Sequence, residues 1–147
     1  MRRLAGSVAA CAALAAAAPA SAYTDGTYKG TQDGTPLTFK VVTKKVKVGG
    51  KRVARRFVRL SGQFTSFDVR CADDFVYHTK LKLDEPTDIR IRAKGKFALE
   101  KQLRFSGRLS GAGAKSRAAG RISFTFPDVP EHGDCTTGSI RWTAKRA

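Results

Sequence analysis

Apolar and polar residues alternate with a period of two through much of the chain. The alternation is clearest in five segments, residues 37–42, 75–83, 103–109, 121–126 and 140–143. One set of alternate positions is mainly apolar and the other is mainly polar or basic. This pattern is typical of antiparallel strands that bury one face and expose the other. The sequence therefore predicts an all-β protein.

Turn-forming residues separate the alternating segments. The turn signals are Asp33-Gly34, Gly49-Gly50, Lys94-Gly95 and residues 111–113. Residues 84–88 contain Pro86, which cannot donate a hydrogen bond in a central strand, and they are predicted to form a loop. Residues 97–103 include good helix formers but keep strand parity, so we expect a strand, a break near Lys101 and a second strand. The spacing predicts one antiparallel domain of about nine to ten short strands, arranged as a meander, barrel or sandwich.

Residues 1–22 have the layout of a secretory signal peptide. A basic head, Arg2-Arg3, precedes an Ala-rich apolar run over residues 4–18 and a small-residue ending. The run is short for a transmembrane helix, which needs about 20 apolar residues. We therefore expect a signal peptide at 1–22 and a secreted domain at 23–147 without a transmembrane segment, free or associated with the cell wall. Residues 8–11 also resemble a lipoprotein box, which leaves lipidation of Cys11 open.

Two cysteines remain after the signal peptide, Cys71 and Cys135. Outside the cytoplasm nothing keeps such a pair reduced, so a disulfide is predicted. The loop-entropy model gives a cross-link of this span a stabilising effect of about 4 kcal/mol. With His78 and His132 the pair could form a Cys2His2 zinc site, but the spacing matches no established zinc motif. We predict the disulfide and no metal site.

Basic residues dominate the charged surface. The chain has 28 Lys and Arg against 12 Asp and Glu; without Arg2 and Arg3 the excess of basic residues gives a net charge of +14. Half of the residues between 44 and 59 are basic, and they are the predicted polyanion-binding residues: Lys44, Lys45, Lys47, Lys51, Arg52, Arg55, Arg56 and Arg59. The alternative is a solvated hairpin around the Gly49-Gly50 turn. Nucleic acid is disfavoured, because no aromatic base-stacking platform accompanies these residues.

The acidic residues gather in three clusters. These are Asp68, Asp73 and Asp74; Asp84, Glu85 and Asp88; and Asp128, Glu131 and Asp134. A Cys71–Cys135 disulfide would bring the first and third clusters to one end of the domain. Calcium binding by these carboxylates stays open, although the loops lack the spacing of a calcium-binding loop. The alternative is that the loop carboxylates pair with neighbouring arginines and lysines.

Catalytic motifs are missing from the sequence. His78 and His132 are the only histidines, no serine lies in a nucleophile elbow, and no cofactor motif is found. We therefore predict no catalytic residues and no cofactor. One alternative is a small-ligand carrier with an apolar cavity lined by Phe39, Tyr77, Phe105, Phe124 and Trp142. A second alternative is an extracellular enzyme whose cleft is assembled from distant residues.

Two stretches carry a family resemblance. Residues 26–31, followed by Gly34 and residues 37–41, resemble the opening hairpin of small exported β proteins of high-GC actinobacteria, and residues 135–144 are similar to their last strand. The resemblance implies a fold and carries no site residues. The Gly-x-aromatic first strand is also similar to that of lipocalin-like and avidin-like barrels, which bind small ligands inside. The leading hypothesis is a secreted, non-enzymatic binding or structural module of the cell envelope, attracted to anionic polymer or lipid surfaces.

Overall fold

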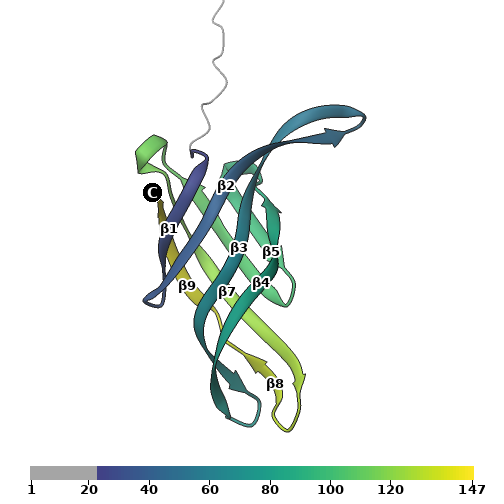
Figure 1. The fold of residues 1–147 in the computed structure, drawn as a ribbon, viewed down its shortest axis with the longest axis vertical. Coiled ribbons are helices and arrows are strands. Elements are labelled where there is room, and N and C mark those ends of the chain that lie inside the picture. Colours follow the sequence, from purple (N-terminus) through teal and green to yellow (C-terminus); the bar gives the residue numbers. More distant parts are fainter. Residues whose placement is uncertain (1–22) are drawn as a thin grey trace, which may run out of the picture.

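The structure is a computed structural model that describes residues 23–147 (Figure 1). The predicted signal peptide at 1–22, including Cys11, lies outside the described residues. The described chain consists of β-strands, turns and two short 3-10 helices, η1 (Ala93–Gly95) and η2 (Gly113–Lys115). The prediction of an all-β fold is confirmed.

Nine strands are present between residues 23 and 147, and every pairing between them is antiparallel. In chain order they are β1 (Gly26–Gln32), β2 (Thr35–Val48), β3 (Lys51–Cys71), β4 (Val76–Arg90), β5 (Lys96–Glu100), β6 (Leu103–Ser110), β7 (Arg117–Val129), β8 (Gly133–Thr136) and β9 (Ile140–Arg146). All four predicted turns lie between strands. The break predicted near Lys101 separates β5 from β6.

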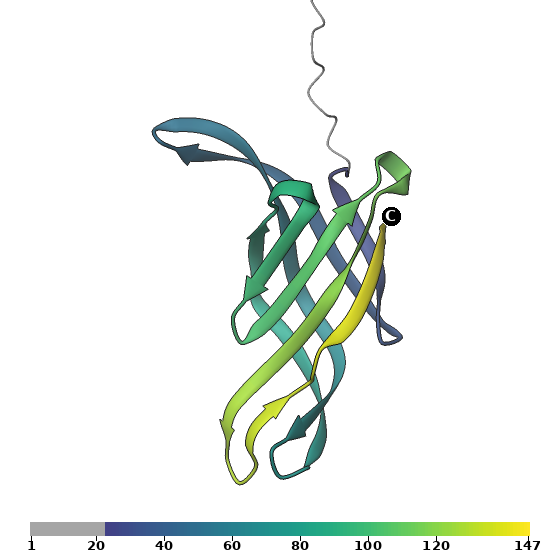
Figure 2. The same cartoon turned by 180° about the vertical axis from the view of Figure 1, so that it is seen from behind.

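The strands form one sheet that closes on itself. The strand order is β4-β3-β2-β1-β9-β7-β6-β5, and β8 pairs with both β3 and β7. A hydrogen-bonded ring therefore runs from β3 through β2, β1, β9, β7 and β8 back to β3. Figures 1 and 2 show this ring from opposite sides. The short β8 is the strand that completes it.

Aromatic side chains fill much of the interior. The rings of Phe105 and Trp142 stack with centroids 4.8 Å apart, and Phe39 meets Trp142 edge-on at 5.5 Å. Gly107 makes room for the indole, because a Cβ at this position would lie 2.6 Å from Cζ2 of Trp142. The residues that make these contacts occupy the apolar alternate positions of their strands, as the period of two predicts.

Residues 84–88 differ from the predicted loop, because β4 continues through them. The register changes from Gly62–Leu83 to Leu60–Thr87, so three residues of β4 bulge opposite Ser61. β4 is also an edge strand, where a missing N–H on the unpaired side costs no ladder bond. The loop prediction was wrong because edge position and bulge both accommodate Pro86, and neither is visible in the local sequence.

β2 and β3 extend beyond the ring as a two-stranded arm, which we define as residues 43–55. β1 pairs with β2 only as far as Val41, and β4 pairs with β3 only from Phe57. Gly49 and Gly50, with φ of 57° and 79°, form the turn at its tip, a conformation that favours glycine. Figure 1 shows the arm projecting at the end of the molecule opposite β8.

Candidate polyanion-binding site

The predicted polyanion-binding residues lie on and below the arm. Six belong to the arm, and Arg56 and Arg59 lie at its base. Directly paired residues of antiparallel strands share a face. The register pairs Lys47 with Arg52 and Lys44 with Arg55, which places these two pairs on opposite faces. The eight residues therefore do not form one continuous binding surface.

Three of the eight residues are already paired with carboxylates. Arg59 donates two hydrogen bonds to Asp88, at 2.8 Å from Nε and 3.2 Å from Nη2, and Lys44 Nζ also donates to Asp88. Arg56 Nε lies 3.4 Å from Asp25. In the described part of the chain the other five form no ion pair: Lys45, Lys47, Lys51, Arg52 and Arg55. Only these five residues therefore match the alternative of a solvated hairpin, because the other three have carboxylate partners.

The two cations beside Asp88 change its titration. The hydrogen bonds from Arg59, and secondly from Lys44, lower the pKa of Asp88 to about 2. A carboxylate of this kind has an ordinary pKa of about 3.9. The ionised form is therefore stabilised by folding, and the contribution is lost as the pH falls from about 4 to about 2.

We predict that Asp88→Asn lowers the free energy of unfolding by about 1 kcal/mol at neutral pH, after allowance for solvent screening of a pair this close to the surface. Urea denaturation should show this difference shrinking between about pH 4 and pH 2, where the wild-type carboxylate becomes protonated. Asp84→Asn on the same strand is the control and should have little effect. If the difference in unfolding free energy between the wild type and Asp88→Asn stayed constant from about pH 4 to about pH 2, the ion pairs of Asp88 would not be its cause.

A second basic surface lies on the outer face of β5, β6, β7, β9 and β1. The register places Arg117 opposite Lys145, and Lys145 opposite Lys29, so three cations lie side by side on three adjacent strands. Lys96 likewise lies opposite Arg108. All five side chains are exposed. Like charges in direct cross-strand register destabilise a sheet, so this arrangement has a cost in the isolated molecule.

Two adjoining hollows lie among these cations. One, of about 560 Å3, is lined by Lys29, Gly30, Thr31, Arg108, Ser110, Arg117, Ala118, Ala119, Thr143, Ala144 and Lys145. The other, of about 590 Å3, is lined by Arg92, Ala93, Lys96, Phe97, Ala98, Ser106, Gly107, Arg108, Ala119, Gly120 and Arg121. They share Arg108 and Ala119. Small residues supply most of the remaining lining, which leaves room between the long basic side chains.

We call this surface the cationic groove and define it by its seven basic residues: Lys29, Arg92, Lys96, Arg108, Arg117, Arg121 and Lys145. No Asp or Glu is among the described residues that line it. None of the seven forms an ion pair with a described carboxylate. Most of its strands face the viewer in Figure 2. The groove therefore combines uncompensated positive charge with open space.

The alternation over residues 103–109 and 121–126 predicts that Arg108 and Arg121 face solvent, but the sequence alone did not assemble the groove. Its members come from strands as far apart in the chain as β1 and β9, and only the pairing register brings Lys29 beside Lys145. The available signal was the parity of each strand, which predicts the outward face of a residue but not its neighbours on other strands.

Four of the five predicted cavity residues are buried: Phe39, Phe105, Phe124 and Trp142. Phe39, Phe105 and Trp142 contact one another as described above, and Phe124 packs on Phe67 with centroids 4.9 Å apart. Tyr77 is partly buried and packs against the edge of the core. Four of the predicted cavity residues thus belong to the core, and a ligand bound among the five stays a prediction.

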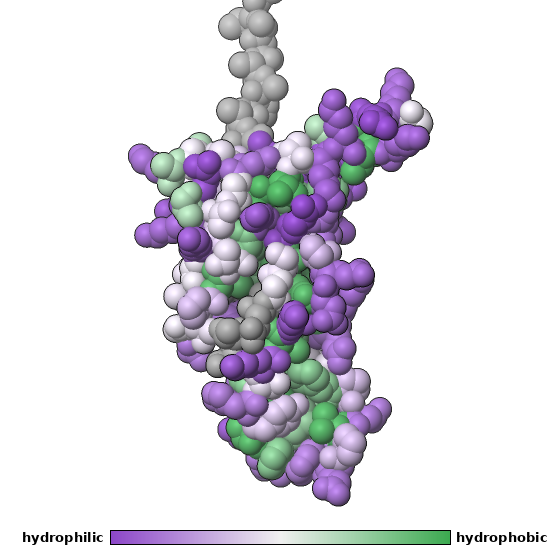
Figure 3. All heavy atoms as spheres, in the orientation of Figure 1, coloured by the Kyte–Doolittle hydropathy of each residue, from purple (hydrophilic) through white to green (hydrophobic). Residues whose placement is uncertain are grey.

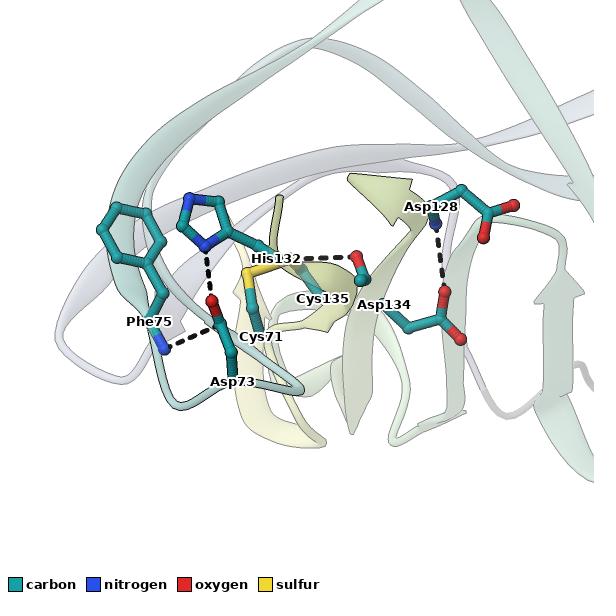
Figure 4. Close-up of a disulfide and its surroundings, with 8 residues drawn as sticks. Cys71, Asp73, Phe75, Asp128, His132, Asp134 and Cys135 are labelled. Atoms are coloured by element: carbon teal, nitrogen blue, oxygen red, sulfur yellow. Dashed lines mark hydrogen bonds and ion pairs between the residues drawn. A yellow bond between two sulfur atoms is a disulfide. The ribbon is translucent and has the colours of Figure 1, made fainter. Parts of the chain in front are cut away.

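The end of the molecule opposite the arm holds the disulfide. Cys71 on β3 lies directly opposite Cys135 on β8, and the two are bonded (Figure 4). His132 Nδ1 lies 2.7 Å from Asp73, and its ring stacks on Phe75 with centroids 4.0 Å apart. The disulfide therefore brings the first and third acidic clusters together, as expected.

The carboxylates at this end have internal partners. The hydrogen bond with His132 is the main cause of a lowered pKa of Asp73, which also accepts the N–H of Phe75 at 3.1 Å. Asp134 accepts the N–H of Asp128 at 3.0 Å (Figure 4). Over residues 23–147 no group of three or more His, Cys, Asp or Glu is placed to hold a metal ion. Asp73 and Asp134 therefore stabilise the turns beside the disulfide through hydrogen bonds within the chain.

Within residues 23–147 the cationic groove thus combines basic residues that have no carboxylate partner with open space between them. Within residues 23–147 no helix has the length and apolar character needed to cross a bilayer. No protein-family model, curated protein or solved structure matches the chain. The functional argument therefore depends on the chain's own residues.

Proposed function

We propose that this protein is a secreted, non-enzymatic module of the cell envelope that binds anionic polymers in the cationic groove. The row formed by Lys29, Lys145 and Arg117 is the observation that carries the proposal. Paired residues on neighbouring strands have Cβ atoms about 5 Å apart, so these three charges repel one another in the free protein. A polyanion lying across the strands would turn this repulsion into attraction.

The shape of the groove supports an extended ligand. The two hollows adjoin at Arg108 and Ala119 and together span strands β5, β6, β7, β9 and β1. With neighbouring strands about 4.8 Å apart, this is a path of about 19 Å across the sheet. A chain of repeated phosphate or carboxylate groups can follow such a path, and attraction to its backbone requires charge rather than a specific sequence of contacts.

Binding to inorganic polyphosphate, measured across a salt series, tests the proposal. The groove variant replaces Lys29, Lys145 and Arg117 with glutamine. We expect affinity at low salt to fall by at least about tenfold and the slope of log affinity against log salt to flatten by about 2, as expected for three lost phosphate contacts to a single-stranded polyanion.

The matched control replaces Lys80, Lys82 and Arg90 on β4, which removes the same charge from another exposed surface. It should retain most of the affinity. Equal losses in the two variants would show attraction to net charge alone and would contradict a binding groove. The wild-type protein should also be retained by isolated cell envelope at low salt, and failure to bind it would contradict the proposed location of the ligand.

A further inference from the structure

The arm exposes apolar side chains next to its basic residues, whereas the cationic groove is defined by basic residues alone. On one face Val46 lies opposite Val53, and Val48 lies opposite Lys51 next to the tip. Lys44 and Arg55 form the next pair on the same face. Val48 is 48% exposed, and Val46 and Val53 are only half-buried by each other. Figure 3 shows hydrophobic surface (green) among hydrophilic side chains (purple) on the arm.

The opposite face of the arm has basic residues but no valine strip. Lys47 lies opposite Arg52, and Lys45 lies opposite Ala54. All three cations are exposed and have no described carboxylate partner. The arm thus exposes a narrow apolar strip together with five unpaired cations.

The arm also lacks support from the rest of the sheet. Among the described residues, 44–55 pair only with each other, so neither outer edge of this hairpin has a backbone partner, and only the side chains of Thr43 and Lys44 reach residues outside it. An isolated two-stranded hairpin is marginally stable in water, and its exposed apolar residues gain from any apolar phase that covers them. A partner that supplies both negative charge and an apolar interior matches these features.

We infer that the arm docks on the surface of an anionic lipid bilayer, with Val46, Val48 and Val53 at the boundary of the acyl chains. Lys45, Lys47 and Arg52 on the opposite face lie at the level of the anionic headgroups, and the long side chains of Lys51 and Arg55 reach the headgroups from the valine face. A soluble polyanion would satisfy the cations but would leave the valines in water, whereas a bilayer interface accommodates both. This inference does not depend on the proposed groove, which lies on other strands.

A tryptophan at the arm's tip would report the insertion. Val48→Trp introduces a fluorophore at an exposed position, while the native Trp142 is 1% exposed and screened by the core. With vesicles of phosphatidylglycerol we expect a blue shift and quenching by brominated lipid. Vesicles of phosphatidylcholine should produce neither effect.

Val76→Trp is the matched control. Val76 is also 48% exposed but lies beside the disulfide, at the end opposite the arm. Its emission should not change with either kind of vesicle. Equal quenching at positions 48 and 76, or no quenching at position 48, would overturn the inference.

Variants of the arm separate the contributions of charge and apolar area. Replacing Lys45, Lys47 and Arg52 with glutamine should weaken vesicle binding by about 100-fold, at about fivefold for each basic residue near the membrane surface. Val46→Thr with Val53→Thr should weaken it by about tenfold, because the polar hydroxyls reduce the apolar area that enters the bilayer. If the valine variant binds vesicles as the wild type does, the arm does not insert.

The polyphosphate assay distinguishes this inference from the proposed function. The arm variant lacking Lys45, Lys47 and Arg52 should bind polyphosphate nearly as the wild type does but lose the vesicles. The groove variant should show the opposite behaviour. Loss of vesicle binding in the groove variant, with the arm variant unaffected, would overturn the assignment of the lipid surface to the arm.

Discussion

Replacement of Trp142 by alanine is expected to lower the free energy of unfolding by about 3–5 kcal/mol, the range for truncation of a large buried aromatic side chain. Trp142 is 1% exposed and contacts three aromatic rings, those of Phe39, Phe97 and Phe105. Its removal leaves a cavity between β9, β6 and β2, which cannot close without moving β9 and β2, two strands of the hydrogen-bonded ring.

Trp142→Phe should cost much less, about 1–2 kcal/mol, because the smaller ring keeps most of the aromatic packing. The indole Nε1 is buried and has no hydrogen-bond partner among the described residues, so phenylalanine gives up no side-chain hydrogen bond at this position. The measurement is urea denaturation followed by far-UV circular dichroism. Val76→Ala, at an exposed position, should stay within about 0.5 kcal/mol of the wild type. Similar losses for Val76→Ala and Trp142→Ala would contradict the assigned core.

Loss of the disulfide is expected to lower the free energy of unfolding by about 4 kcal/mol, because the cross-link closes a long loop in the unfolded chain. The Cys71 and Cys135 positions are 64 residues apart. The double serine variant also leaves β8, which is only four residues long, without its covalent link to β3. Since β8 completes the ring, we expect faster hydrogen exchange first at residues 72–75 and 128–136.

Reduction of the wild-type protein provides the control for this prediction. Dithiothreitol should lower the stability of the wild type to about that of the double variant and should leave the variant unchanged. Hydrogen exchange in β1, β2 and β9 should respond less than exchange around β8. If both proteins unfold at the same urea concentration without reductant, the disulfide contributes no stability and the loop-entropy argument is wrong.

Local patterns in the sequence predicted most of the fold. Alternation over 121–126 and 140–143 predicted strands that became β7 and β9, and the glycine-containing turn signals predicted the turns between strands. These features could be predicted because strand parity and turn geometry depend on neighbouring residues. Residues 84–88 are the exception, since the tolerance of Pro86 depends on the position of β4 at the edge of the sheet.

The candidate site was predicted less completely. The run of basic residues between 44 and 59 indicated a hairpin around Gly49-Gly50, and the arm is that hairpin. The sequence suggested that loop carboxylates pair with basic residues, but it did not indicate that Asp88 pairs with Lys44 and Arg59, because these residues lie on other strands. It also did not indicate that the arm's remaining cations divide between two faces, which follows from the register of β2 and β3.

Composition and periodicity were sufficient for the all-β class, the outward direction of the basic residues and the pairing of the last two cysteines. The assembly of a site depended on contacts between distant strands. Lys29 and Lys145 are separated by most of the domain, yet antiparallel pairing of β1 with β9 places them directly opposite each other. A period of two determines which face a side chain occupies, whereas its neighbours on that face are set by strand order and register, which long-range packing of the core selects.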